Sequence, residues 1–121
     1  MTAIKESSTI QENLKSGRLS CPITYVMERI GGYWKPIILC HLTMSDLRYS
    51  ELRRAVPDIT EKVLIQQLKQ LEADGLVVRE ARPVVPPYVT YSLTAAGQDL
   101  VPLFEAMAVW AAKDVSLSLK G

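Results

Sequence analysis

The chain has 121 residues, 48% of them hydrophobic and 22% charged, a composition typical of one folded domain with a small core. Its formal net charge is only +1, so binding to nucleic acid would require positive charge to be concentrated on one surface. No apolar run approaches the length of a membrane span, and the N-terminal residues lack the apolar segment of a signal peptide. We therefore expect a cytoplasmic protein without a membrane partner.

Side chains suited to catalysis or metal binding are sparse. Cys21 and Cys40 have neither the spacing of zinc ligands nor that of a disulfide framework, and His41 has no further ligand nearby in the sequence. The sequence offers no nucleophile with a base, no carboxylate pair in a plausible cleft and no glycine-rich phosphate loop. We therefore expect no enzyme, no metal ion and no cofactor, and we place Cys40 in the core of an apolar helix.

Residues 1–19 are polar and are predicted to form an arm, whereas residues 20–121 are predicted to form a single domain. The first helix is expected to open at Ser20-Cys21-Pro22, because proline is tolerated in the first helical turn, and to end at Gly31-Gly32. Its apolar stripe consists of Ile23, Val26, Met27 and Ile30. A second helix is predicted from Pro36 to about Met44, with core candidates Ile37, Ile38, Leu39 and Leu42.

Residues 49–75 are predicted to form a helix-turn-helix. A short helix would have Ser50 as its N-cap, and Pro57-Asp58 would end it because proline cannot continue a helix. Thr60 would then cap a longer helix that Gly75 terminates. At 100° per residue, the buried face of that longer helix would be formed by Leu64, Leu68 and Leu71.

The face of the longer helix opposite these leucines carries Lys62, Gln66 and Lys69 and no acidic residue. Lysine can contact guanine or phosphate and glutamine can pair with adenine, so this face suits an approach to DNA. The alternative is a solvated face that happens to be rich in glutamine. The helix taken alone does not decide between them.

Residues 76–93 are predicted to form a β-hairpin with a proline-rich tip, which is a wing because it directly follows the long helix. Tyr91 and Leu93 would alternate inward, and Arg79 and Arg82 would point toward a phosphate backbone. The alternative for both arginines is solubilising charge on an edge strand.

Residues 94–117 are predicted to form a C-terminal helix capped by Thr94 and kinked or split by Pro102. This helix has more apolar surface than the edge of a small domain needs, so we expect it to pair two subunits together with the first helix. The alternative is that its stripe completes the monomer core. The predicted interface residues are Ile23, Val26, Met27, Leu103, Phe104, Met107 and Trp110.

A series of motifs with natural spacing runs from Cys21 to Trp110. It includes Cys21-Pro22-Ile23, Ile30-Gly31-Gly32-Tyr33-Trp34-Lys35, Tyr49-Ser50-Glu51-Leu52-Arg53-Arg54, Ile59-Thr60-Glu61-Lys62-Val63-Leu64, Asp74-Gly75-Leu76-Val77 and Pro86-Pro87-Tyr88-Val89-Thr90-Tyr91. The whole series resembles the HxlR-type winged-helix transcriptional regulators of the MarR-like superfamily. The expected fold class is therefore α+β: a mostly helical winged helix-turn-helix domain with a two-stranded wing, dimerising through its N- and C-terminal helices.

The resemblance implies a bacterial or archaeal homodimer that binds double-stranded DNA, with the long helix in the major groove and the wing on the adjacent backbone. It also implies that a carboxylate at Glu61, where relatives often carry a smaller or neutral residue, can alter base preference. Lys35 matches a family lysine that meets either DNA or an acidic side chain. The implied base-edge residues are Thr60, Lys62, Val63, Gln66 and Gln67. The implied backbone contacts are Ser50, Arg53, Lys69, Arg79, Arg82 and Tyr88.

Some relatives respond to electrophiles or oxidants through a cysteine at the position of Cys21. A thiol at a helix N-terminus feels the positive end of the helix dipole, which favours the reactive thiolate. The alternative is a small residue that only caps and packs.

Two further alternatives concern function as a whole. The modest net charge would also suit a winged-helix module that binds protein instead of DNA. A small-molecule effector could bind between the dimerisation helices and the winged domain, although aromatic residues at helical spacing are more often plain core. The residues that could line such an effector pocket are Tyr33, Trp34, Phe104, Met107 and Trp110.

Overall fold

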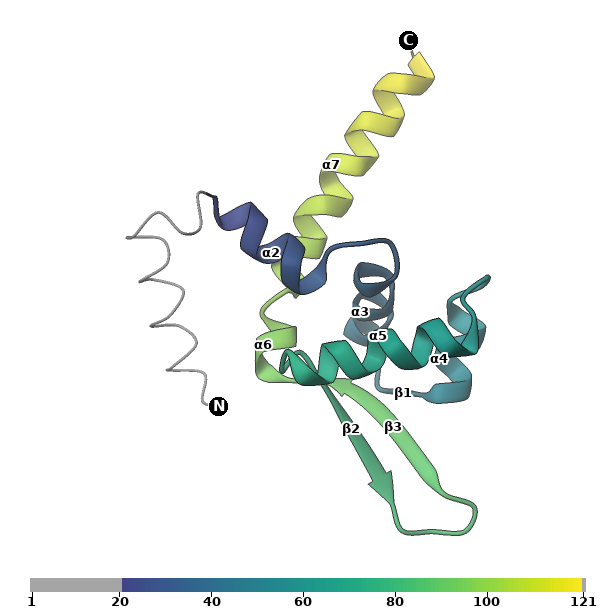
Figure 1. Cartoon of the computed structure of the whole chain (residues 1–121). Coiled ribbons are helices and arrows are strands. Elements are labelled where there is room, and N and C mark those ends of the chain that lie inside the picture. Colours follow the sequence, from purple (N-terminus) through teal and green to yellow (C-terminus); the bar gives the residue numbers. More distant parts are fainter. Residues whose placement is uncertain (1–20, 121) are drawn as a thin grey trace. The chain divides into compact units, whose positions relative to one another are not determined.

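The computed structural model describes residues 21–120, so the predicted arm at residues 1–19 lies outside the described residues (Figure 1). The chain divides into two compact units, residues 1–32 and residues 33–121. The elements in chain order are α2 (Pro22–Ile30), α3 (Trp34–Met44), β1 (Leu47–Arg48), α4 (Tyr49–Ala55), α5 (Glu61–Ala73), β2 (Val77–Arg82), β3 (Tyr88–Leu93), α6 (Ala95–Gln98) and α7 (Val101–Lys120).

Helix α2 is the described element of the first unit. It begins at Pro22, directly after Cys21, and its last turn is closed by the Gly31 N–H, which donates to the Met27 carbonyl at 2.8 Å. The next residue, Gly32, has a φ of 90°. The predicted proline start and glycine end of this helix are confirmed. Of its apolar stripe, Ile23 and Met27 are exposed and Val26 is half-buried.

The core of the second unit is formed mainly by leucine, isoleucine and valine side chains from α3, α4, α5 and the segments around them, with further residues from β2 and β3. The predicted leucine face of α5 is confirmed, because Leu64, Leu68 and Leu71 are at most 1% exposed. In α3, three of the four predicted core residues are buried and Ile37 is half-buried. The side chains with less than 2% exposure are Ile38, Leu39, Leu52, Leu64, Leu68, Leu71 and Val56.

The turn between α4 and α5 has the predicted breaks. Asp58, after Pro57, has a φ of 71°, which ends the helical path. Thr60 then caps α5, since its side-chain oxygen accepts the Val63 N–H at 3.1 Å. Gly75, with a φ of 73°, turns the chain after α5 into the hairpin, a conformation that glycine adopts without steric cost.

The predicted two-stranded wing is present as the antiparallel strands β2 and β3, and β1 adds a third strand, so the order in the sheet is β1-β3-β2. Strand β3 pairs with β2 from Val77↔Leu93 to Arg82↔Tyr88, and on its other side with β1 through Leu47↔Tyr91. Tyr91 and Leu93 are buried as predicted. The third strand is only two residues long, too short to show any alternation in the sequence.

The C-terminal segment is split as predicted, but the break precedes Pro102. Helix α6 is capped by the Thr94 hydroxyl, which accepts the Gly97 N–H at 3.1 Å and donates to the Gly75 carbonyl at 2.6 Å. Helix α7 then starts at Val101, with Pro102 in its first turn, where the missing N–H has little cost. Within the described residues, no helix is long and apolar enough to cross a membrane.

Gly97 holds α6 against the start of the wing. A Cβ added there would lie 2.3 Å from the Leu76 carbonyl oxygen and about as close as 3.1 Å to the Leu93 side chain. We expect Gly97→Ala to lower the free energy of unfolding by about 1–3 kcal/mol, because the backbone at Leu76, directly before β2, must move. Urea denaturation measures this, with Ala96→Gly on the exposed face of the same helix as a comparison; an unchanged midpoint for Gly97→Ala would contradict the close approach.

Candidate DNA interface

The outer face of α5 is the centre of the candidate interface. Lys62, Gln66 and Lys69 are exposed and lie opposite the buried leucine face, as the helical periodicity predicts. Val63 and Gln67 lie on one flank and are half-buried. The outer face therefore presents amide and ammonium groups to solvent, with the acidic side chains of the helix displaced to its other flank.

Ser50 is exposed in the first turn of α4, but it is not the N-cap. The helix begins at Tyr49, directly after β1, and Arg48, two residues before Ser50, occupies the cap position in extended conformation. The Glu51 carboxylate accepts the Arg48 backbone N–H at 2.8 Å. The prediction of a serine cap is wrong because pairing of β1 with β3 fixes where the strand ends, and Glu51 satisfies the free N–H from inside the helix.

Arg53 does not point freely into solvent. Its guanidinium lies 3.8 Å from the Glu61 carboxylate, so an ion pair joins α4 to the first residue of α5 across the turn. The Arg53 side chain is 43% exposed and the Glu61 side chain 64% exposed. Sequence spacing gives no signal for this pair, because the turn between the helices decides which side chains meet.

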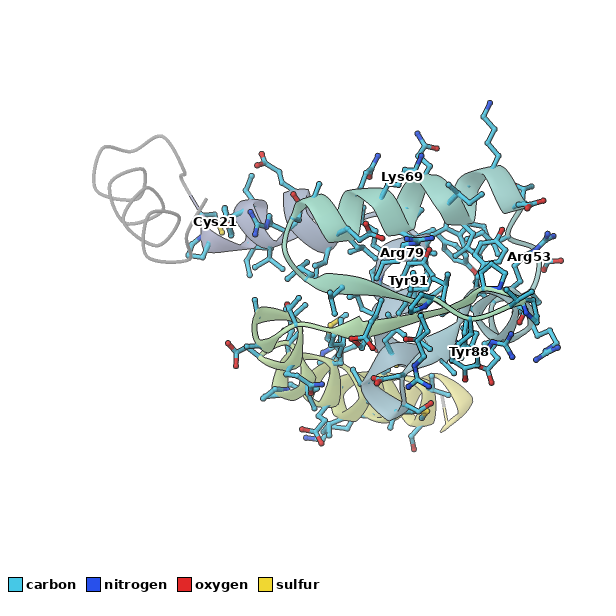
Figure 2. All side chains as sticks on the ribbon, turned by 90° about the horizontal axis from the view of Figure 1, so that it is seen from below. Cys21, Arg53, Lys69, Arg79, Tyr88 and Tyr91 are labelled. Carbon is cyan, nitrogen blue, oxygen red and sulfur yellow. The ribbon has the colours of Figure 1, made fainter. Side chains whose placement is uncertain are left out.

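A cleft of about 540 Å³ separates α5 from the hairpin. Figure 2 shows Lys69 on α5 beside Arg79 and Tyr91 of the hairpin, with Arg53 toward one end of the helix. The cleft has mixed charge, since Glu61 and Glu72 of α5 also line it. The structure thus brings Lys69 and Arg79, both predicted to contact the DNA backbone, to one groove beside the outer face of α5.

Two arginines, Arg48 and Arg82, stack on Tyr88, which lies next to the tip of the hairpin. The Arg48 guanidinium carbon lies 4.5 Å, and that of Arg82 5.2 Å, from the centroid of the Tyr88 ring. These are cation–π distances, and they hold two positive charges together beside the exposed tip at residues 83–87. The sequence predicts Arg82 and Tyr88 as wing residues that contact DNA, but it does not predict this stacking. Arg48 was missed because only the pairing of β1 with β3 brings it there.

Tyr49, near the Arg53–Glu61 pair, has a buried hydroxyl. No group in the described part of the chain makes a hydrogen bond of good geometry to that oxygen. Burial raises the pKa of Tyr49 above its ordinary value of 10.0, and the negative charge of Glu61 adds to this, whereas Arg53 acts in the opposite sense. The hydroxyl therefore stays neutral at all ordinary pH values.

We expect Tyr49→Phe to leave the free energy of unfolding unchanged or slightly higher at pH 7, because it removes a buried hydroxyl that makes no hydrogen bond of good geometry and has only the nearby Arg53 guanidinium to compensate it. The raised pKa means that the unfolded chain loses this proton first as pH rises through 10, so the wild-type protein loses stability there. The Tyr49→Phe variant should lose less folding stability than the wild type as the pH rises above 10. Urea denaturation at pH 7 and above pH 10 tests this, and a clear loss at pH 7 would show that the hydroxyl has a partner.

Two further predicted positions, Lys35 and Cys21, belong to α3 and to the start of α2. Lys35 is half-buried in the first turn of α3. Cys21 is half-buried at the N-cap of α2, where its carbonyl accepts the Thr24 N–H at 3.0 Å and its thiol makes no capping bond. Within residues 21–117, no group of three histidine, cysteine or acidic side chains is placed to hold a metal ion.

An apolar groove of about 530 Å³ lies between α3 and α7. Cys40 lines it and is exposed, so the prediction that Cys40 lies in the core is wrong. The helix is apolar on more than one side, and only the position of α7 decides which side is covered. Of the predicted effector pocket, Phe104, Met107 and Trp110 line the groove, whereas Tyr33 and Trp34 stack edge-to-face with each other at 4.7 Å.

Known proteins share this arrangement over most of the chain. The chain is 41% identical over 90 residues to an uncharacterized HTH-type transcriptional regulator of Methanothermobacter thermautotrophicus, covering 74% of this chain and 69% of the relative. The crystal structure of YtcD, an HTH-type transcriptional regulator, superposes on the chain with a TM-score of 0.76 at 42% identity. The superposition covers 79% of this chain and 98% of the YtcD chain. A protein of the same name occurs in Bacillus subtilis.

The redox regulator HypR is similar in both of its forms. The reduced form has a TM-score of 0.77 at 39% identity and covers 84% of this chain and 100% of that one. The oxidized form has a TM-score of 0.72 at 43% identity, and the match covers 77% of this chain and 96% of the HypR chain. The sequence profile of the HxlR-like helix-turn-helix family matches residues 29–118, which contain α3 to α6 and most of α7. By its sequence, its winged helix-turn-helix fold and these relatives, the chain belongs to the HxlR-like helix-turn-helix family of transcriptional regulators.

Proposed function

We propose that the protein regulates transcription as a homodimer that binds a pseudo-palindromic DNA operator, with α5 in the major groove and the hairpin on the flanking backbone. The observation that carries this proposal is the exposed, acid-free face of α5 formed by Lys62, Gln66 and Lys69. This face lies beside a hairpin that presents further cations. A protein that binds a chromosomal operator would act in the cytoplasm. Regulation by DNA binding requires no catalytic group.

The chemistry of each side chain suggests its role in the complex. Side chains that can meet base edges are Thr60, Lys62, Val63, Gln66 and Gln67. Side chains that can hold phosphates are Ser50, Arg53, Lys69, Arg79, Arg82 and Tyr88, to which we add Arg48, with Lys35 as a further candidate. Because the net charge is only +1, affinity depends on the local grouping of these cations and on two subunits binding together.

The apolar face of α7 supports dimerisation. Leu103, Met107, Trp110 and Leu117 are exposed large side chains that recur at helical spacing. Exposed apolar surface on this scale marks an interaction site. With the apolar stripe of α2, a second copy could cover it and set the two α5 helices about 34–36 Å apart, one turn of DNA.

Selection from a randomised DNA library, followed by fluorescence anisotropy on the selected site across salt concentrations, tests the function. We expect Gln66→Ala and Lys62→Ala each to weaken specific binding by roughly 5–150-fold, while Gln98→Ala on the exposed side of α6 leaves it unchanged. The logarithm of the binding constant should fall steeply with that of salt concentration. Weak binding that is indifferent to sequence would favour a protein-interaction module instead.

A thiol switch at Cys21 is a second part of the proposal, supported by similarity to HypR, described as a redox regulator. Diamide would take two hydrogens from the Cys21 thiols of a dimer and leave an intersubunit disulfide. We expect diamide to change operator affinity in the wild type and in Cys40→Ser, but not in Cys21→Ser. Equal responses of all three proteins would exclude the switch and leave the DNA-binding function intact.

A further inference from the structure

Glu61 is an unexpected residue in a DNA interface, because a carboxylate repels phosphates. It is the first residue of α5, directly after the Thr60 cap, and its side chain is 64% exposed. The N-terminal residues of a recognition helix are those that approach base edges most closely. We propose that Glu61 selects cytosine at one position of each operator half-site, and that Arg53 is the positioning residue that holds its carboxylate. This inference rests on the proposed DNA-binding function.

The hydrogen-bonding capacity of a carboxylate determines which base it can select. Ionised glutamate only accepts hydrogen bonds, and in the major groove cytosine offers the N4 amino group as a donor without an adjacent acceptor. Guanine presents two acceptors and thymine one acceptor and a methyl group, so both would face the carboxylate unfavourably. Adenine has a donor at N6, but the adjacent N7 acceptor repels the second carboxylate oxygen. A carboxylate therefore discriminates mainly by rejecting the other three bases.

The ion pair with Arg53 has the features that such a role requires. The two groups are 3.8 Å apart and both are substantially exposed, so the pair contributes little to folding stability. Its geometry instead holds the Glu61 side chain at the junction of α4 and α5, near Tyr49. The guanidinium also offsets part of the repulsion between the carboxylate and the phosphates. At this distance, the Glu61 oxygens retain the capacity to accept a further hydrogen bond.

The carboxylate lies on the flank of α5 that borders the cleft, next to Lys62 on the outer face. Glu72 borders the same cleft from the last turns of the helix, farther from the end that enters the groove first. The two glutamates share the helix and the cleft but differ in their distance from its N-terminus. Glu72 is therefore the matched control for a base contact by Glu61.

The test is selection from a randomised DNA library with the full-length wild-type protein, Glu61→Gln and Glu72→Gln, each checked for folding by circular dichroism. We expect the wild type to enrich cytosine at one position of each half-site. Glu61→Gln should enrich adenine there, because glutamine pairs with adenine N6 and N7, while the other positions stay the same. Glu72→Gln should keep the wild-type preference. Replacing the selected cytosine should weaken wild-type binding by roughly 5–150-fold.

Arg53 variants separate positioning from general electrostatics. Arg53→Ala should reduce the discrimination between cytosine and the other bases as well as the affinity, and Arg53→Lys should restore part of the discrimination. If Glu61→Gln binds all sequences more tightly with unchanged preferences, Glu61 only repels DNA and the inference is overturned. A clear wild-type motif without the cytosine overturns it as well. A wild-type pool with no motif at all would overturn the proposed function and this inference with it.

Discussion

Replacing both Met107 and Trp110 with glutamate is expected to make the protein monomeric and to weaken operator binding by at least about a hundredfold. The two side chains are 50% and 67% exposed on one face of α7 and border the apolar groove beside α3. A charged group buried at a subunit interface without a partner is strongly unfavourable. Two linked recognition helices bind two half-sites with an avidity gain of about 10²–10⁴, which a monomer loses.

Size-exclusion chromatography with light scattering measures the oligomeric state, and fluorescence anisotropy on the selected operator measures affinity. The matched control is Val109→Glu, which places the same charge on the opposite side of α7, where Val109 is also exposed. That variant should remain dimeric and bind normally. A dimeric double variant would contradict the proposed interface, and a monomer with full operator affinity would contradict the need for two subunits.

Leu68→Ala is expected to lower the free energy of unfolding by about 2–5 kcal/mol, the range for deleting a fully buried leucine side chain. Leu68 is 1% exposed and lies at the centre of the buried face of α5. Because a domain of this size has a total stability of about 5–15 kcal/mol, the variant should be markedly less stable. The loss arises from lost transfer energy and from the cavity left beneath the recognition helix.

Urea denaturation followed by circular dichroism measures this effect. Ile65→Ala on the same helix is the control, because Ile65 is 38% exposed at the edge of the cleft. This substitution should lower the free energy of unfolding by less than half as much as Leu68→Ala. Similar losses for the two variants would contradict the burial of Leu68. In Leu68→Ala, the folded fraction should still recognise the selected operator, since the exposed face of α5 is unchanged.

The two side-chain arrangements that matter most for the DNA interface differ in how far the sequence reveals them. The outer face of α5 follows from helical periodicity, because the burial of Leu64, Leu68 and Leu71 fixes which residues lie opposite. The contact of Arg53 with Glu61, and the stacking of Arg48 on Tyr88, join residues from different elements. Such contacts depend on the turn between helices and on strand pairing, which no local pattern encodes.

The sequence by itself determined the features that local interactions control. Thr60 and Thr94 cap helices, Asp58 and Gly75 change the chain direction, and these residues act through neighbours within a few positions. The tertiary structure alone decided that Cys40 is exposed, that β1 pairs with β3, and that α4 starts at Tyr49, which displaces Ser50 from the cap position. Exposure and strand pairing are set by surfaces distant in the chain, so residues with the same local pattern can lie in the core or in solvent.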